Sequence, residues 1–496
     1  MLDRGPGDGP NACVHDASPA VALAAVRDFS GPVLVDLDET LYLRNSTEDF
    51  IDTARPALAA YLLLKLLDVL RPWLLTGPGT RDVWRVRAVL LAFPWVLPLW
   101  RRRAAALARG ATNIALSEAL EARREPPVIV TLGFRPIVAP LLAAMGFGGA
   151  RIVSARLWNA ADRRGGKLGF LRRELDHAAL RGSLCVTDSL EDMPVLDACA
   201  LPLRTVWPEA RFHPAFADLY LPGRYLTRIK RPNKHYIRRS ILQDDFALWV
   251  LCSVWLAPLP LLHIAGLLCL LVSFWAIYEQ GYVDNDRIAA RFEADPRLSE
   301  TWGVIPVATP SVAPWLWAGA AGFAGLALIG GWSLPDPLSA AIWAGVLLAT
   351  ALCFRLFNRL DKSTRIWPYG PLQLARCAAF AAVVPLVPMA PAAIGAHVVE
   401  KWVPYIVYRR GGGAAWDLPL HLMRLGFFLA LILLIAATQG LGVLIEAPTL
   451  AFLAFTLFKA RREIRSALAR ARWITRADRA SAGHRQTVVT DRTGAR

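Results

Sequence analysis

The chain has 496 residues, which is long enough for two to four domains. Its formal net charge is +16, and 55% of its residues are apolar, with the longest apolar runs after Phe246. The seven cysteines are scattered without a C-x-x-C pair, which argues against a disulfide framework or a zinc site. The positive charge fits either nucleic-acid binding or basic loops beside a bilayer. Because Lys and Arg flank the apolar runs, we expect a lipid bilayer as partner and no nucleic acid.

The start of the chain is polar and rich in Gly and Pro, and we expect residues 1–28 to form a flexible N-terminus. This segment lacks the basic region and the apolar stretch of a secretory signal. The first folded domain is therefore expected to stay in the cytoplasm.

A short apolar run, Val33 to Val35, predicts a buried strand, and Asp36 and Asp38 follow it directly. Two carboxylates this close together are costly unless they share a cation or a proton. Hard oxygen ligands at the C-terminal end of a parallel strand favour Mg²⁺. The alternative is a strand followed by an ordinary acidic turn.

A long helical stretch, residues 48–120, comes next and contains two strongly apolar pieces. Each piece is interrupted by charged residues or prolines and is short for a membrane span of ~20 residues. Two interpretations remain open: an amphipathic or re-entrant hairpin on the membrane surface, or a buried helical layer.

Three further segments predict strands, and each is followed by polar or charged side chains that are candidates for the site. Val128 to Val130 form a strand that ends at Thr131, whose hydroxyl can donate to a phosphate oxygen beside the helix that begins near Pro136. After the next strand comes Lys167, and the arginines around it fit a solvated basic loop. The segment SLCVTDSLEDMP then gives a strand followed by Asp188 and Asp192.

This series of motifs resembles the haloacid dehalogenase (HAD) superfamily over roughly residues 31–214. The resemblance implies a Rossmann-like parallel sheet with a helical cap at residues 48–120. It also implies a Mg²⁺-dependent phosphatase. Asp36 would attack phosphorus, Asp38 would be the acid and base, and Thr131 and Lys167 would hold the phosphate. The metal residues are then Asp36, Asp38, Asp188 and Asp192.

The second half of the chain reads as a membrane domain, residues 246–460, after a basic linker at 221–245 that could bind anionic headgroups or a pyrophosphate. We expect eight spans, at about 246–261, 263–279, 313–331, 337–354, 372–388, 391–408, 418–437 and 441–458. Alternate loops are basic, which by the positive-inside rule puts both termini and the first domain on the cytoplasmic side of the inner membrane. Residues 461–496 are expected to be a basic, disordered tail.

An acidic cluster follows the second expected span and resembles the first Asp-rich motif of the UbiA family of intramembrane prenyltransferases. The resemblance implies an all-α bundle that binds a prenyl diphosphate through Mg²⁺. The candidate residues are Glu279, Asn285, Asp286, Asn358, Asp361 and Lys362. The second Asp-rich motif of that family is missing. Ionisable residues at membrane depth, which normally face a cavity or a partner, are Glu400, Lys401, His421 and Arg424.

The sequence thus predicts an α/β HAD-like domain fused to a UbiA-like helical bundle. Phosphatase action on a phosphorylated, lipid-linked substrate is the first hypothesis. The alternatives are a polyprenyl transferase with an auxiliary HAD domain, or a degenerate bundle that serves only as an anchor.

Overall fold

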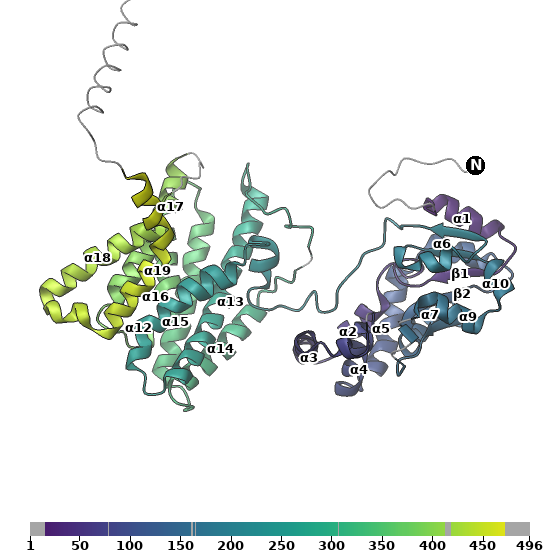
Figure 1. Cartoon of the computed structure of the whole chain (residues 1–496), viewed down its shortest axis with the longest axis horizontal. Coiled ribbons are helices and arrows are strands. Elements are labelled where there is room, and N and C mark those ends of the chain that lie inside the picture. Colours follow the sequence, from purple (N-terminus) through teal and green to yellow (C-terminus); the bar gives the residue numbers. More distant parts are fainter. Residues whose placement is uncertain are drawn as a thin grey trace, which may run out of the picture. The chain divides into compact units, whose positions relative to one another are not determined.

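The computed structural model describes residues 15–77, 79–159, 162–163, 165–305, 307–411 and 418–471. The chain divides into two compact units, Met1–Leu219 and Tyr220–Arg496 (Figure 1). Each unit has its own hydrophobic core. The boundary between the two units lies next to residue 221, where the predicted basic linker begins.

A five-stranded parallel sheet lies at the centre of the first unit, with the strand order β3-β2-β1-β4-β5. The strands are β1 (Val33–Asp36), β2 (Val128–Phe134), β3 (Arg151–Ala155), β4 (Leu184–Thr187) and β5 (Leu201–Arg204). The two strands β1 and β4 are buried along their whole length, which explains why they read as continuous apolar runs. The parallel sheet expected from these runs is confirmed.

Several helices accompany the sheet, and the one that the sequence predicts near Pro136 is present. They are α1 (Pro19–Asp28), α7 (Arg135–Ala144), α9 (Gly166–Glu174), α10 (His177–Arg181) and α11 (Met193–Leu196). Helix α1 corrects the expectation of a flexible segment up to residue 28. The Ser18 side chain accepts a hydrogen bond from the backbone N–H of Val21, and Pro19 occupies the first helical position, so this segment carries its own start signal. Residues 1–14 lie outside the described part of the chain.

The insertion between β1 and β2 is a helical cap. It comprises α2 (Ser46–Asp52), α3 (Ala57–Leu70), the 3₁₀ turn η1 (Pro72–Leu75), α4 (Arg81–Ala92), α5 (Val96–Ala111) and α6 (Ile114–Glu121). Its inner face is buried in the same core as the sheet; for example, Trp100 is fully buried and donates to the carbonyl of Ile137. Helices α4 and α5 are bent by 115° against each other. The interpretation of residues 48–120 as a buried helical layer therefore holds for the inner face of the cap. The outer face of α3 exposes apolar side chains.

The second unit is all helical. Its helices are α12 (Ala247–Ser253), α13 (Pro260–Phe292), α14 (Ala313–Ile329), α15 (Pro337–Arg359), α16 (Ile366–Ala378), α17 (Ala390–Arg410), α18 (Leu420–Gln439) and α19 (Ala447–Arg470). Each expected span overlaps at least one of these helices. By length and composition, however, only α13, α15 and α18 of the described helices could each cross a membrane, or four segments if the bent pair α4–α5 counts as one. These helices suggest membrane association, but eight crossings are not confirmed.

Several apolar runs are shorter helices than expected because proline interrupts them. Helix α12 is continued only by the short 3₁₀ turn Val254–Leu256, just before Pro258.

The predicted linker is also mostly helical, with π-helical segments at Leu226–Lys230 and Ile237–Phe246. At the other end, α19 continues to Arg470, into the segment expected to be a disordered tail; residues 472–496 lie outside the described part.

Glycine allows the close approach of helices in the second unit. A Cβ atom on Gly281 of α13 would lie 2.2 Å from the ring of Phe354 on α15. A Cβ atom on Gly266 would lie 2.7 Å from the carbonyl oxygen of Gly325 on α14. Small residues at such crossings let helix backbones pack closely, as they do in membrane bundles.

We expect Gly281→Ala to destabilise the second unit by about 1–3 kcal/mol, because Phe354 has to move. Thermal unfolding of the detergent-solubilised chain would show this as a lower Tm. Gly345→Ala on α15 is the matched control, because its Cβ would meet no atom within 4 Å. Equal Tm values for the two variants would contradict this packing.

Candidate active site

Predicted catalytic side chains lie on the three central strands, at the C-terminal ends of β1 and β4 and within β2. Asp36 is the last residue of β1, Asp188 follows β4 directly, and Thr131 lies in β2. Because β1 lies between β2 and β4 in a parallel sheet, these three positions meet at one edge.

Lys167 joins two of the predicted aspartates. Its Nζ atom lies 2.7 Å from Oδ1 of Asp36 and 2.7 Å from Oδ2 of Asp192. All three residues are buried. The alternative of a solvated basic loop is therefore wrong: Lys167 lies in the first turn of α9 and is ion-paired inside the site.

Thr187 is a residue of this site that sequence reasoning missed. Its hydroxyl lies 3.1 Å from Oδ2 of Asp36 and 2.5 Å from Oδ2 of Asp192, and it is almost fully buried. The same oxygen of Asp192 thus faces both Lys167 and Thr187. Asp192 holds these two groups in position against Asp36.

Asp38 lies in a tight turn that follows β1. Glu39 adopts the left-handed conformation at φ 59°, and the backbone N–H of Tyr42 donates to the carbonyl of Leu37. Oδ1 of Asp38 accepts a hydrogen bond of 2.6 Å from the backbone N–H of Ser46, the first residue of α2. The start of the cap therefore orients the second aspartate.

Thr40 connects the turn after β1 to the loop after β4. Its hydroxyl donates to Oδ1 of Asp188 over 3.0 Å and accepts from the backbone N–H of the same residue over 3.1 Å. Thr40 is fully buried. The motif D-x-D-x-T contains this threonine, but its partner 148 residues away is visible only in the fold.

Thr131 is buried beside Gly133, whose backbone N–H donates to the threonine hydroxyl over 2.9 Å. A Cβ on Gly133 would lie 2.8 Å from a methyl group of Val138 and 3.1 Å from the Thr131 hydroxyl. Glycine is therefore the residue that lets the chain turn here. Thr131 accepts in this bond and keeps its own proton for another acceptor.

Burial raises the pKa of Asp36 to about 7; the carboxylates of Asp192 and Asp188 add to the rise, and Lys167 opposes it. Burial also raises the pKa of Asp38 and of Asp188. Burial disfavours the charged form of Lys167, but Asp36 and Asp192 outweigh this and raise the pKa of Lys167 above its ordinary value. The edge of the sheet thus gathers more carboxylates than one buried lysine neutralises.

This donor set fits a Mg²⁺ ion held by two carboxylates rather than four. Among the described residues, no three of the predicted metal ligands bring carboxylate oxygens within 4.8 Å of one another. Mg²⁺ typically keeps several waters and binds through one or two carboxylates and substrate phosphates. Asp36 and Asp188, with the carbonyl of Asp38, suit that demand. Asp192 faces Lys167 instead, and Asp38 faces Ser46.

Arg163 is a second residue that sequence reasoning missed. Its guanidinium donates to the carbonyl of Leu132 over 2.7 Å and pairs with Asp82 of α4 over 3.1 Å. Its charge also opposes the rise in the pKa of Asp38, which burial causes. In the sequence it is one of several arginines around Lys167, so nothing marks it as the one that bridges the core to the cap.

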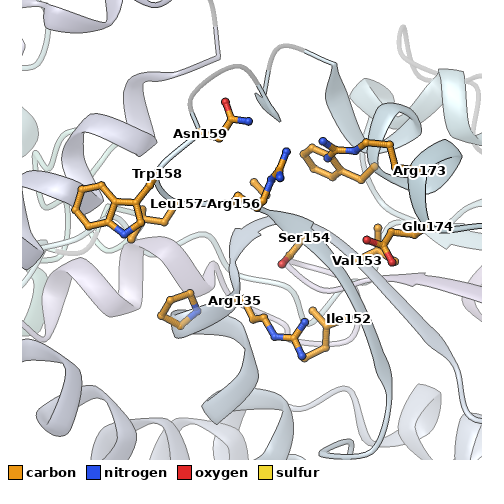
Figure 2. Close-up of a pocket in the computed structure, with 13 residues that line it drawn as sticks. Arg135, Ile152, Val153, Ser154, Arg156, Leu157, Trp158, Asn159, Arg173 and Glu174 are labelled. Atoms are coloured by element: carbon orange, nitrogen blue, oxygen red, sulfur yellow. The ribbon is translucent and has the colours of Figure 1, made fainter.

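A cavity of about 620 Å³ lies at the end of β3, and none of the predicted catalytic residues lines it (Figure 2). Arg135, Arg156 and Arg173 contribute positive charge to its walls. Two of them, Arg156 and Arg173, already pair with Asp162 over 2.8 and 2.9 Å. We assign this cavity no role in the chemistry.

The residues predicted to hold a prenyl diphosphate do not form one site with free carboxylates, because Glu279 and Asp286 are bound by other protein groups. Glu279 accepts hydrogen bonds from the backbone N–H groups of Gly223 and Leu226, over 3.0 and 2.7 Å. Asp286 accepts from the Tyr225 hydroxyl over 2.9 Å and pairs with Lys230. The predicted linker therefore occupies both carboxylates.

The remaining residues of that prediction have local partners too. Asn285 donates to the side chain of Asn358 over 2.9 Å. Asp361 accepts from the backbone N–H groups of the two residues at 363 and 364. Lys362 pairs with Glu293 over 3.1 Å. The structure gathers these side chains into separate contacts rather than into one ligand shell.

A cluster of buried ion pairs lies in the second unit, and the sequence predicted only some of its members. Asp245 faces Nε of Arg376 at 2.6 Å and Nε2 of His397 at 3.3 Å. Glu400 pairs with Arg424 over 3.0 Å and faces Nδ1 of His421 at 2.7 Å. Ionisable groups inside an apolar helical unit need such partners. The predicted cavity residues are thus engaged in ion pairs.

A parallel sheet with a helical insertion after β1, two aspartates at the end of that strand and a lysine ion-paired at the same edge form a Rossmann-like α/β domain with a cap. Residues 33–197 match the family described as haloacid dehalogenase-like hydrolase. This part of the chain is therefore a HAD-like hydrolase domain. Comparisons with curated proteins and with solved structures gave no match. The UbiA resemblance of the second unit is not confirmed.

Proposed function

We propose that the first unit is a Mg²⁺-dependent phosphatase that works through an aspartyl-phosphate on Asp36. The observation that carries this proposal is the contact of one buried lysine, Lys167, with both Asp36 and Asp192 at 2.7 Å. This contact joins motifs that lie far apart in the chain. It holds Asp36 next to a fixed positive charge, beside the strand ends where a phosphate would bind.

The surroundings of each side chain suit it to a different step of the reaction. Asp36 attacks phosphorus, and the bond to the leaving oxygen breaks. Asp38, whose pKa is raised by burial, donates its proton to that oxygen and later takes a proton from the water that hydrolyses the aspartyl-phosphate. Lys167 and Thr131 would hold phosphoryl oxygens, while Thr40 and Thr187 position Asp188 and Asp36.

The metal would be held by Asp36, Asp188 and the carbonyl of Asp38, and when bound it offsets the negative charge of the phosphoryl oxygens. We expect chelation to abolish phosphate release by the purified full chain, and added Mg²⁺ to restore it. Phosphate release would be measured over a panel of phosphomonoesters that includes phosphorylated lipids. Undiminished turnover in excess chelator would contradict this part of the proposal.

We further propose that the second unit anchors the phosphatase in a membrane, with the basic loops, both termini and the first unit on the cytoplasmic side. The apolar helices α13, α15 and α18 support the anchor, and the alternation of basic loops supports the orientation. A substrate carried on a lipid suits an enzyme at that surface. A transferase activity is less favoured because Glu279 and Asp286 already have protein partners.

A further inference from the structure

The cap exposes an unusual number of large aliphatic side chains. Six of them lie on α3 and η1, which are separated in the chain only by Arg71. Their exposed fractions are Leu62 56%, Leu66 54%, Val69 77%, Leu70 65%, Leu74 72% and Leu75 88%. We call these six residues the cap stripe. In water, a continuous apolar surface of this kind is costly and marks a contact with a partner or a membrane.

The positions along α3 show that the cap stripe is one face of an amphipathic helix. Its members in α3 are spaced by four, three and one residues, which places them on one side. The opposite side is packed into the core of the first unit through Ala60 and Leu64. The fold of the first unit therefore does not need the exposed side chains of the cap stripe, because α3 packs against the core through a different face.

Charged side chains border the cap stripe as they border interfacial helices. Lys65 and Arg81 are half exposed, and both pair with Asp68 over 3.4 and 2.6 Å. Arg71 ends α3 in the left-handed conformation and is exposed. Long basic side chains of this kind lay their stems along apolar surface while the charge stays among water and headgroups.

We propose that the cap stripe lies in the headgroup and acyl boundary of the lipid bilayer that holds the second unit. Helix α3 has 14 residues, about 21 Å, which is too short to cross a bilayer but suited to lie along its surface. The occupant is a bilayer because the same chain carries helices long and apolar enough to cross one, and the anchor proposed for them keeps a lipid surface within reach of the first unit. The net positive border suits anionic headgroups. The proposal rests on the membrane anchor proposed above for the second unit, and it is independent of the phosphatase chemistry.

The test measures how close the cap stripe comes to acyl chains in the full-length protein. Leu70→Cys and, separately, Leu75→Cys carry an environment-sensitive fluorophore in protein reconstituted into vesicles with a minor fraction of anionic lipid. Nitroxide groups on the lipid acyl chains quench a fluorophore that enters the boundary. Ala178→Cys on α10, an exposed residue outside the cap, is the matched control. The chain without an added cysteine gives the background from native thiols.

We expect at least about threefold stronger quenching at Leu70 and Leu75 than at Ala178. A second variant, Leu66→Asp with Val69→Asp, should reduce the quenching at Leu75 to the control value, because it adds charge to an exposed face without touching the core. Quenching no stronger than the control would overturn the proposal. A fluorophore shielded from water but unaffected by the nitroxide lipids would also overturn it, and would assign the stripe to a second copy or to another part of the chain.

Discussion

Asp36→Asn is expected to lower phosphate release by at least roughly 1,000-fold, because the amide is a poor nucleophile and cannot form the aspartyl-phosphate. The residue is buried beside Lys167, and asparagine has the same shape, so the variant should keep the fold. Steady-state release of phosphate by the full chain, with Mg²⁺ present, measures the effect.

The matched control for this variant is Glu191→Gln. Glu191 is an exposed carboxylate in the 3₁₀ turn Leu190–Asp192 that follows β4. We expect its activity to stay within about twofold of the parent. Similar losses in the two variants would show that Asp36 has no special part in the reaction.

Lys167→Met is expected to destabilise the first unit by about 3–5 kcal/mol at neutral pH, because it leaves the buried carboxylates of Asp36 and Asp192 without their cation. Hydrogen exchange of peptides from β1 and β4 reports the stability of this unit alone. Lys65→Met is the control. Lys65 is half exposed and pairs with a surface aspartate, so its loss should cost less than about 0.5 kcal/mol.

Lower pH and added Mg²⁺ should each restore part of the free energy of unfolding that the Lys167→Met variant has lost. Burial raises the pKa of Asp36 to about 7 from an ordinary 3.8, and removal of Lys167 raises the pKa further. The folded state therefore binds a proton that the unfolded state releases above about pH 4, so the stability of the variant should rise as the pH falls from 8 towards 5. Added Mg²⁺ should also stabilise it by supplying the missing positive charge. A loss that neither condition reduces would mean that packing alone is affected.

The strands and the first set of site residues could be read from the sequence because their signals are local. The run Val33 to Val35 is apolar on both faces and ends directly in Asp36, and the same pattern recurs before Asp188. Since the C-terminal ends of parallel strands share one edge, adjacency in the chain was enough to predict adjacency in space.

Other features depend on contacts between distant segments and leave no local mark. Thr187 looks like any threonine that ends a strand until the fold puts its hydroxyl beside Asp36, 151 residues away. Glu279 and Asp286 look like free carboxylates until the segment around Tyr225 donates to them. Asp245 was placed in a linker, although it pairs with Arg376 131 residues later.

In the proposed mechanism, Asp36 carries the phosphoryl group during turnover. The most direct measurement is acid quenching of the full chain during turnover with a phosphomonoester and Mg²⁺, followed by borohydride reduction and mass spectrometry. We expect residue 36 to be converted to homoserine, and the conversion to disappear in Asp36→Asn. Turnover with no reducible acyl phosphate, or with one on another residue, would contradict the account.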